Sequence, residues 1–103
     1  GIVFPAIFFH ASDREDIKNF VHEYESKYGN IPSSLTAQAY DSVGILIEAI
    51  KQAGSLDRES IKNQMYNITY NGVTGLTTFN EIGDAQKVFT RVKIENGQFV
   101  EIK

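Results

Sequence analysis

The stretch Pro32–Asp57, PSSLTAQAYDSVGILIEAIKQAGSLD, decides the fold class of this chain. Ser33 or Ser34 follows the proline and can cap a helix by accepting a backbone N–H hydrogen bond, and Gly54 can end the helix in the left-handed conformation. Apolar residues recur at the helical steps of three and four: Leu35, Ala39, Val43, Leu46 and Ile50. The stripe is widened by Tyr40, Ile45, Ile47 and Ala49. A helix this apolar is expected to pack on more than one side.

Two further helices are expected on either side of this one. Ser12-Asp13-Arg14-Glu15 has the pattern of a capping box that opens a helix, and Gly29 suits its end. The apolar residues between them have helical spacing: Ile17, Phe20, Val21, Tyr24 and Tyr28. Asp57 can cap a third, shorter helix, whose apolar residues are Ile61, Met65 and Ile68.

Strands are expected towards the two ends of the chain. The run Ile2–Phe9 is apolar without alternation, which indicates a strand buried on both faces in a parallel sheet, and Pro5 within it marks a break or a crossing. Later segments give turn and strand signals: a turn at Asn71-Gly72, a short strand at Gly75–Phe79, a turn at Asn80–Asp84, and a hairpin of Lys87–Glu95 and Gln98–Ile102 around Asn96-Gly97. The predicted fold class is α/β, with a buried strand, three helices, a short strand and a C-terminal β-hairpin.

The expected buried strand lacks enough partners within the chain. The short strand and the terminal hairpin could flank it on one side only. Because unpaired buried backbone groups are costly, either other chain segments are missing or the chain exchanges strands with a second copy.

Composition excludes several classes of function. The 103 residues suffice for one domain, with a net charge of −3 and no Lys/Arg-rich run, so no nucleic-acid partner is expected. There is no cysteine, which excludes disulfides and thiolate chemistry. His10 and His22 are the only histidines, and neither lies at metal-ligand spacing from the other or from paired carboxylates. The oxygen-rich turn Asn80–Asp84 lacks the alternating ligands of a calcium loop, so neither a metal nor a cofactor is expected.

Several short motifs, in this order, resemble the end of the type I periplasmic solute-binding proteins, the branched-chain amino acid class of ABC importers. They are Phe20, Tyr24, Tyr28-Gly29 and Pro32, then Ala39–Val43 and Ala49–Asp57, then Asn71–Gly75, Phe79-Asn80 and Gly83-Asp84, and finally Asn96–Val100. Members of that family have two α/β lobes joined by crossing strands, with a small ligand held between the lobes.

The resemblance implies that residues 1–103 are a single C-terminal fragment of such a protein, a partial lobe. Residues 1–9 would be a strand and hinge crossing, with the hinge at Phe4 and Pro5. Residues 12–70 would be the helical part of the first lobe, and residues 75–103 the terminal strands.

The resemblance also suggests which residues could face the ligand. Leu35 lies five residues before Tyr40, where family members place a side chain against the ligand, although the branched-chain binders often have an aromatic residue there. Leu35 could equally be the first core residue of its helix. Ser34 lies at the helix N-terminus, whose free N–H groups could meet a carboxylate. Tyr40 is expected to pack between its helix and the sheet, and Asp41 to face solvent or pair locally.

The implied function is ligand binding without catalysis. The full protein would be the periplasmic or extracellular component of an ABC importer, free or lipid-anchored, which binds an amino acid, branched-chain or related. Its partners would be the amino acid, the permease subunits, the missing N-terminal portion of its own chain and, for the fragment alone, a strand-swapped second copy. The alternative is a ligand-sensing domain of the same fold in a signalling system.

Overall fold

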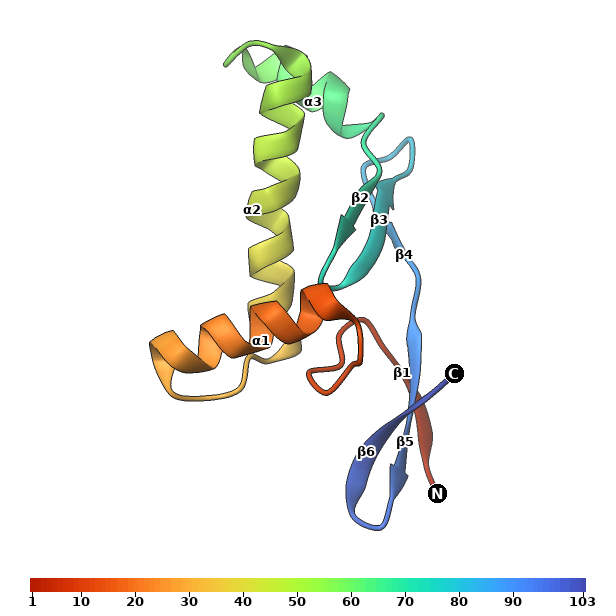
Figure 1. The fold of residues 1–103 in the computed structure, drawn as a ribbon. Coiled ribbons are helices and arrows are strands. Elements are labelled where there is room, and N and C mark those ends of the chain that lie inside the picture. The colour runs from red at the N-terminus through yellow and green to blue at the C-terminus, as the bar shows by residue number, and fades with distance from the viewer.

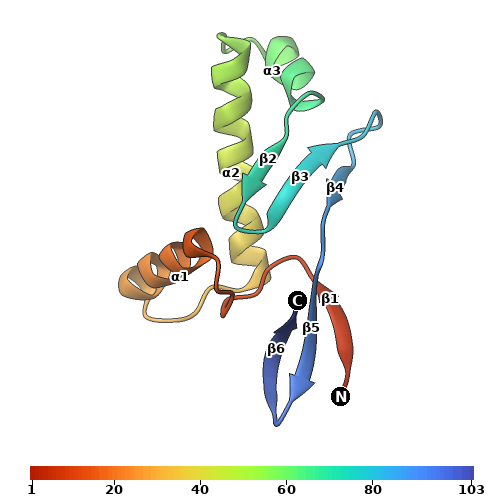
Figure 2. The ribbon, with the colours of Figure 1, turned by 45° about the vertical axis from the view of Figure 1, so that its right-hand side comes forward.

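The computed structural model describes all of residues 1–103, which form three helices and two small antiparallel sheets (Figure 1). The elements in chain order are β1 (Val3–Ala6), α1 (Glu15–Tyr28), α2 (Ser34–Ala53), α3 (Arg58–Met65), β2 (Tyr70–Gly72), β3 (Gly75–Phe79), β4 (Ala85–Lys87), β5 (Thr90–Glu95) and β6 (Gln98–Ile102). The molecule is elongated, 51 × 31 × 19 Å, with the β2–β3–β4 sheet beside α2 and the β1–β5–β6 sheet at the opposite end (Figures 1 and 2).

Helix α2 begins and ends as its sequence predicts, but it buries a different face. The Ser33 side chain accepts a hydrogen bond from the Thr36 N–H at 3.2 Å, and Gly54 ends the helix at φ 64°. The buried residues are Ala37, Asp41, Ile45 and Ala49. The predicted stripe lies on another side, where Leu35 is 78% exposed and Val43 58% exposed. The helix is apolar around most of its circumference, so the sequence pattern could not tell which side packs within this chain.

Helix α1 begins later than the capping box predicts. Arg14 precedes the helix in an extended conformation, and no side chain caps its first turn. Ser12 is buried, and its hydroxyl accepts the Arg14 N–H at 3.3 Å, which closes a local turn two residues long. The prediction that Ser12 opens the helix was therefore wrong, because this turn competes with capping. Gly29 ends α1 at φ 78°, as predicted.

The first strand is not the buried strand of a parallel sheet. Strand β1 pairs antiparallel with β5 alone and forms one edge of the order β1-β5-β6. Val3 and Pro5 are exposed, whereas Phe4 and Ala6 are half-buried. Pro5 fits an edge strand because it has no N–H to donate to a further neighbour. The run of apolar residues was misleading because Phe8, beyond the strand, is the residue of this segment that enters the core.

The predicted turns of the two hairpins, β2–β3 and β5–β6, agree with the structure to different extents. The Asn96-Gly97 turn joins β5 to β6, and both residues have positive φ (53° and 76°), as an Asn-Gly turn favours. Lys87, predicted to begin this hairpin, instead belongs to β4 and pairs with Thr77 of β3. The Gly75–Phe79 strand is confirmed, but its turn lies at Val73-Thr74, not at Asn71-Gly72.

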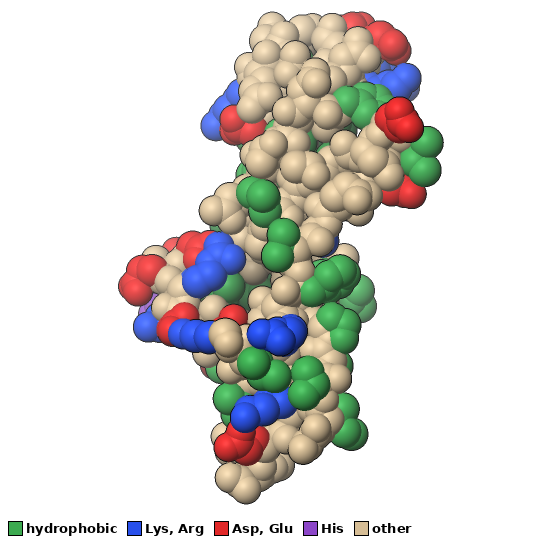
Figure 3. Space-filling model, turned by 90° about the vertical axis from the view of Figure 1, so that its right-hand side faces the viewer, with side chains coloured by type: hydrophobic (Ala, Val, Ile, Leu, Met, Phe, Trp, Pro, Cys, Tyr) green, Lys and Arg blue, Asp and Glu red, His purple; other side chains and the backbone are tan.

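The core is small and divided into two clusters. One joins α1, the start of α2 and the β2–β3 turn: Phe8, Ile17, Phe20, Ala37 and Val73. The other joins α2 to α3 and the segment before β2: Ile45, Ala49 and Ile68. Only 15 of the 103 residues are buried, so much apolar surface remains exposed. Figure 3 shows such hydrophobic side chains at the middle of the face that carries β4 and β5.

Candidate functional site

A pocket lies where the start of α2 meets the β1–β5–β6 sheet, and we call it the hinge-side pocket. It is lined by Phe4, Ala6, Phe8, Phe9, His10, Pro32, Ser33, Ser34, Val92 and Phe99. Most of these side chains are apolar, and the polar groups are two serines and a histidine. The arrangement suits a small ligand with an apolar body and a polar end.

The aromatic walls of this pocket are held by ring contacts. Phe4 of β1 and Phe99 of β6 meet edge to face, with ring centroids 5.7 Å apart at 82°. Phe8 meets Phe20 of the core in the same way at 5.9 Å and 84°. These contacts tie the walls to the sheet and to α1, so the pocket has a defined shape.

The structure brings together two of the four predicted site residues. Ser34 and Phe4 both line the hinge-side pocket. Leu35 does not line it, and its side chain projects from the first turn of α2 with 78% exposure. Pro5 is exposed, since successive residues of a strand point to opposite faces. No contact within residues 1–103 buries Leu35, and its role as ligand contact or first core residue stays a prediction.

A buried carboxylate, which sequence reasoning missed, fixes α2 against the β2–β3 hairpin. Asp41 is only 2% exposed and accepts the backbone N–H groups of Val73 at 3.0 Å and Thr74 at 2.8 Å. The Thr74 hydroxyl donates to the same carboxylate at 2.5 Å. The prediction that Asp41 faces solvent was wrong, because these three donors replace its hydration. Its spacing from Ala37 and Ile45, four residues on each side, was the available signal.

A lysine completes this network from β4. Lys87 Nζ donates to the hydroxyl oxygens of Thr74 at 2.8 Å and Thr77 at 2.6 Å. Burial lowers the pKa of Lys87, while the negative charge of Asp41 opposes that change. Thr74 and Thr77 are almost fully buried, so the network has no access for a substrate and is a structural tie.

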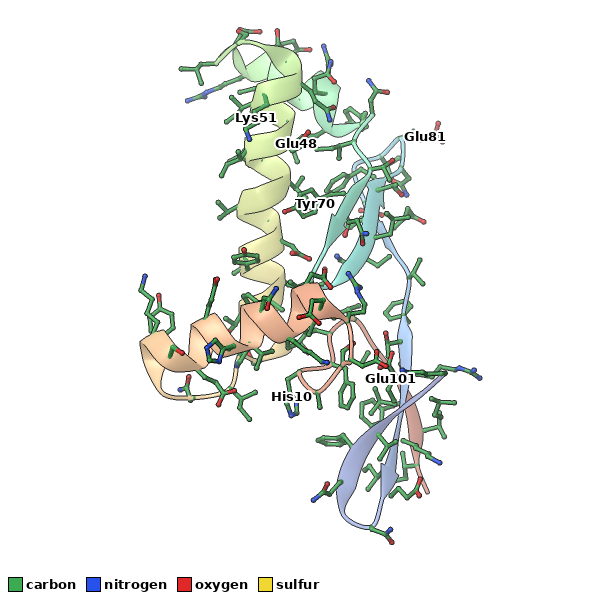
Figure 4. All side chains as sticks on the ribbon, viewed as in Figure 1. His10, Glu48, Lys51, Tyr70, Glu81 and Glu101 are labelled. Atoms are coloured by element: carbon green, nitrogen blue, oxygen red, sulfur yellow. The ribbon has the colours of Figure 1, made fainter.

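The region around Asp41 is closely packed, and the charge of Asp41 acts on a neighbouring tyrosine. A Cβ at Gly72 would overlap the Asp41 carboxylate, and one at Gly44 would overlap the Tyr70 hydroxyl. Burial raises the pKa of Tyr70, and the charge of Asp41 raises it further. Figure 4 shows the Tyr70 side chain reaching from β2 towards α2. Arg14 adds a further tie, since it donates to the Gly72 carbonyl at 3.3 Å.

Tyr40 and His10 each pack against an aromatic ring. Tyr40 is 55% exposed and packs on the Phe20 ring of α1 at 4.7 Å, so it does not lie between helix and sheet as predicted. His10 is half-buried, tilted against the Phe9 ring. No group of three His, Cys, Asp or Glu residues is placed to hold a metal ion. No helix is both long and apolar enough to cross a membrane.

Comparison with known sequences decides the family. The model of one family, described as periplasmic binding protein, matches residues 1–98. The chain belongs to this family. The resemblance found in the sequence motifs is therefore confirmed, as is the partial α/β fold of its members.

Solved structures agree with the family. A protein from Rhodospirillum rubrum, named for a branched-chain amino acid ABC transporter, is 33% identical with a TM-score of 0.90, and the match covers 99% of this chain and 30% of that one. A leucine binding protein from Thermotoga maritima is also 33% identical, with a TM-score of 0.75, over 100% of this chain and 30% of its own. The chain thus spans under a third of the length of these relatives.

A curated relative from Geobacillus stearothermophilus bears a different name. This protein, named limonene hydroxylase, is 32% identical over 73 residues, which are 69% of this chain and 13% of its own length. The matched segment is thus a small part of that protein, and the family and the structural relatives are binding proteins of transporters.

Proposed function

We propose that this chain is part of an extracytoplasmic solute-binding protein of an ABC importer, which binds an amino acid, branched-chain or related. The observation that carries the proposal is the match of almost the whole chain to a leucine binding protein at 33% identity. The apolar hinge-side pocket with its serine edge is compatible with such a ligand. The protein would bind and release its ligand without making or breaking bonds.

Within such a protein, the chain would supply the helical part of the first lobe and part of the hinge. In this proposal Phe4 and Pro5 lie at the crossing between lobes, and Ser34 and Leu35 face the ligand. The support for Leu35 is its place in the chain, directly after Ser34, which lines the hinge-side pocket. Domain closure would then bury it against the ligand.

The exposed side of α2 supports the existence of further chain outside residues 1–103. We define the α2 apolar face as Ala39, Val43, Leu46, Ile47 and Ile50, all on one side of the helix. In this proposal the rest of the same protein covers that face, as the length of the relatives suggests. Permease subunits would be the second protein partner, and the whole protein would be outside the cytoplasm, free or lipid-anchored.

The name of the Geobacillus relative does not change this proposal. The matched residues are 13% of that protein, so its named activity can reside in the remainder. Transport and sensing, in contrast, share one fold, so the fold does not decide between them.

The experiment is a thermal-shift screen of the full protein that carries this chain, with leucine, isoleucine, valine, short amides and, as a control, aspartate. A ligand at about 100 times its dissociation constant adds roughly 2.7 kcal/mol of stability. A shift with a branched-chain amino acid is the expected result. A shift with amides alone would reject that ligand and favour a sensor, and no shift with any amino acid would reject the proposal.

A further inference from the structure

A second surface runs between α1 and the middle of α2, away from the hinge-side pocket. We call it the α1–α2 groove. It consists of two adjoining pockets that share Phe20, Glu23 and Tyr40. Tyr24 and Tyr28 line one end. The other end reaches β2, where its lining includes Asp16, Asn19 and Tyr70.

Aromatic rings form much of this groove. Phe20 lies 4.7 Å from Tyr40 and 6.2 Å from Tyr24, and Tyr24 lies 4.7 Å from Tyr28, measured between ring centroids. Tyr28 and Tyr40 are 60% and 55% exposed. Four of the five tyrosines of the chain therefore line one groove, and their ring faces carry partial negative charge.

Acidic groups add to this negative potential. Asp16 is paired with Arg14 at 2.6 Å, whereas Glu23 is exposed and takes part in no ion pair. Lys27 is the one basic residue in the lining, and its ammonium lies 5.8 Å from the centre of the Tyr28 ring. The groove therefore has one cation, Lys27, beside its aromatic rings. The Glu23 carboxylate, which lines both pockets, has no ion-pair partner.

We propose that the α1–α2 groove docks an arginine or lysine side chain presented by a partner protein. The apolar stem of such a side chain would lie along the tyrosine rings, and its charged head would reach Glu23 and the face of Tyr40. The row of ring contacts from Tyr28 through Tyr24 and Phe20 to Tyr40 favours this occupant over a compact cation, which would touch fewer of the rings. The inference is independent of the ligand proposed for the hinge-side pocket.

The test uses the full protein that carries this chain, with ¹³C-labelled tyrosine, and a capped Gly-Arg-Gly peptide as the probe at low salt. The tyrosine signals of residues 24, 28, 40 and 70 are expected to shift, while Tyr66, which does not line the groove, stays unchanged and is an internal control. A Gly-Gln-Gly peptide is expected to cause no shift, because its side chain is polar but shorter and uncharged.

Three variants make the test specific. Glu23→Gln is expected to weaken binding of the arginine peptide by up to about fivefold, the upper end of the range for one exposed ion pair. Lys27→Met should strengthen binding, since it removes the competing cation. Glu25→Gln, on the same helix but outside the groove, should have no effect.

Three results would overturn the proposal. They are equal shifts with the arginine and glutamine peptides, equal losses from Glu23→Gln and Glu25→Gln, and binding of tetramethylammonium as tight as that of the peptide. All three variants change exposed side chains, and circular dichroism would verify that each remains folded.

Discussion

The carboxylate of Asp41 accepts two hydrogen bonds from Thr74, one from its backbone N–H at 2.8 Å and one from its hydroxyl at 2.5 Å. Thr74 lies in the turn between β2 and β3, and Asp41 lies in the middle of α2. A single side chain therefore holds the hairpin in register with the helix. Because both residues are almost fully buried, water cannot replace either bond if one partner is changed.

Replacement of Asp41 should therefore be costly. We expect Asp41→Asn to lower the free energy of unfolding by about 2–4 kcal/mol, since the amide NH₂ group would face donors that need an acceptor. Urea denaturation followed by circular dichroism measures this change. The control is Asp84→Asn, an exposed carboxylate in a turn, which should change stability by less than about 0.5 kcal/mol. Equal effects at the two positions would contradict the role of the buried network.

A methyl group at Gly72 should disrupt the same network by crowding. A Cβ there would overlap the Asp41 carboxylate, so we expect Gly72→Ala to cost about 2–3 kcal/mol. Gly29→Ala is the comparison, because that glycine has positive φ but open space around it. It should cost about 1 kcal/mol, from backbone strain alone. The reverse order of the two effects in urea denaturation would show that the packing around Asp41 is looser than described.

Tyr70 should ionise at a higher pH than an ordinary tyrosine. Burial and the charge of Asp41 raise its pKa above the ordinary value, so its contribution to stability is present below that value and is lost as the pH rises through its folded-state pKa. In a spectrophotometric titration of the 103-residue chain, Tyr70→Phe should remove a component that titrates above the ordinary tyrosine value. Loss of an early component in Tyr70→Phe would be inconsistent with the raised pKa.

The α2 apolar face should matter more in a longer protein than in this chain. Leu46 is 45% exposed here, so Leu46→Glu should change the stability of the 103-residue chain by less than about 0.5 kcal/mol. If the rest of the protein covers the face, the same change should cost the full protein about 2–4 kcal/mol, because it buries a charge. Thermal denaturation of both forms measures this difference. The control is Gln52→Glu, at an exposed position on α2. Equal effects of Leu46→Glu in both forms would argue against burial of the α2 apolar face by the rest of the protein.

The role proposed for Leu35 predicts an effect on affinity without one on stability. In the full protein, Leu35→Ala should weaken binding of the identified amino acid by about tenfold, the loss expected for removing about 1.5 kcal/mol of apolar contact. Isothermal titration calorimetry measures it. Leu56→Ala, at the other end of α2 and 81% exposed, should leave the affinity unchanged. An unchanged affinity in Leu35→Ala would remove Leu35 from the site.

Local signals in the sequence predicted the three helices and the Asn96-Gly97 turn. The burial of Asp41 and the buried face of α2 depend on tertiary contacts. The caps at Ser33 and Asp57 and the stops at Gly29 and Gly54 depend on a few neighbouring residues, and all four were predicted correctly. The buried role of Asp41 depends on donors more than thirty residues away along the chain, which no local pattern contains. The buried face of α2 could not be predicted for a similar reason, since its apolar residues exceed what this chain can cover.

For the candidate site, the sequence predicted individual residues, but it did not predict which of them lie together. Ser34 and Phe4 were proposed for separate roles, as ligand contact and hinge, and the fold places both in one pocket. The pocket itself could not be predicted, because Phe4 and Phe99 come from opposite ends of the chain and meet only through the strand order β1-β5-β6.

That strand order also constrains when the parts of the chain can fold during synthesis. Of the elements described, β1 emerges from the ribosome before the helices, but its only partner, β5, emerges after them. Helices α1 to α3 and the β2–β3 hairpin have all their mutual contacts available before then. The helical part is therefore expected to form before this sheet, with β1 unpaired until the local β5–β6 hairpin has emerged and supplies its edge.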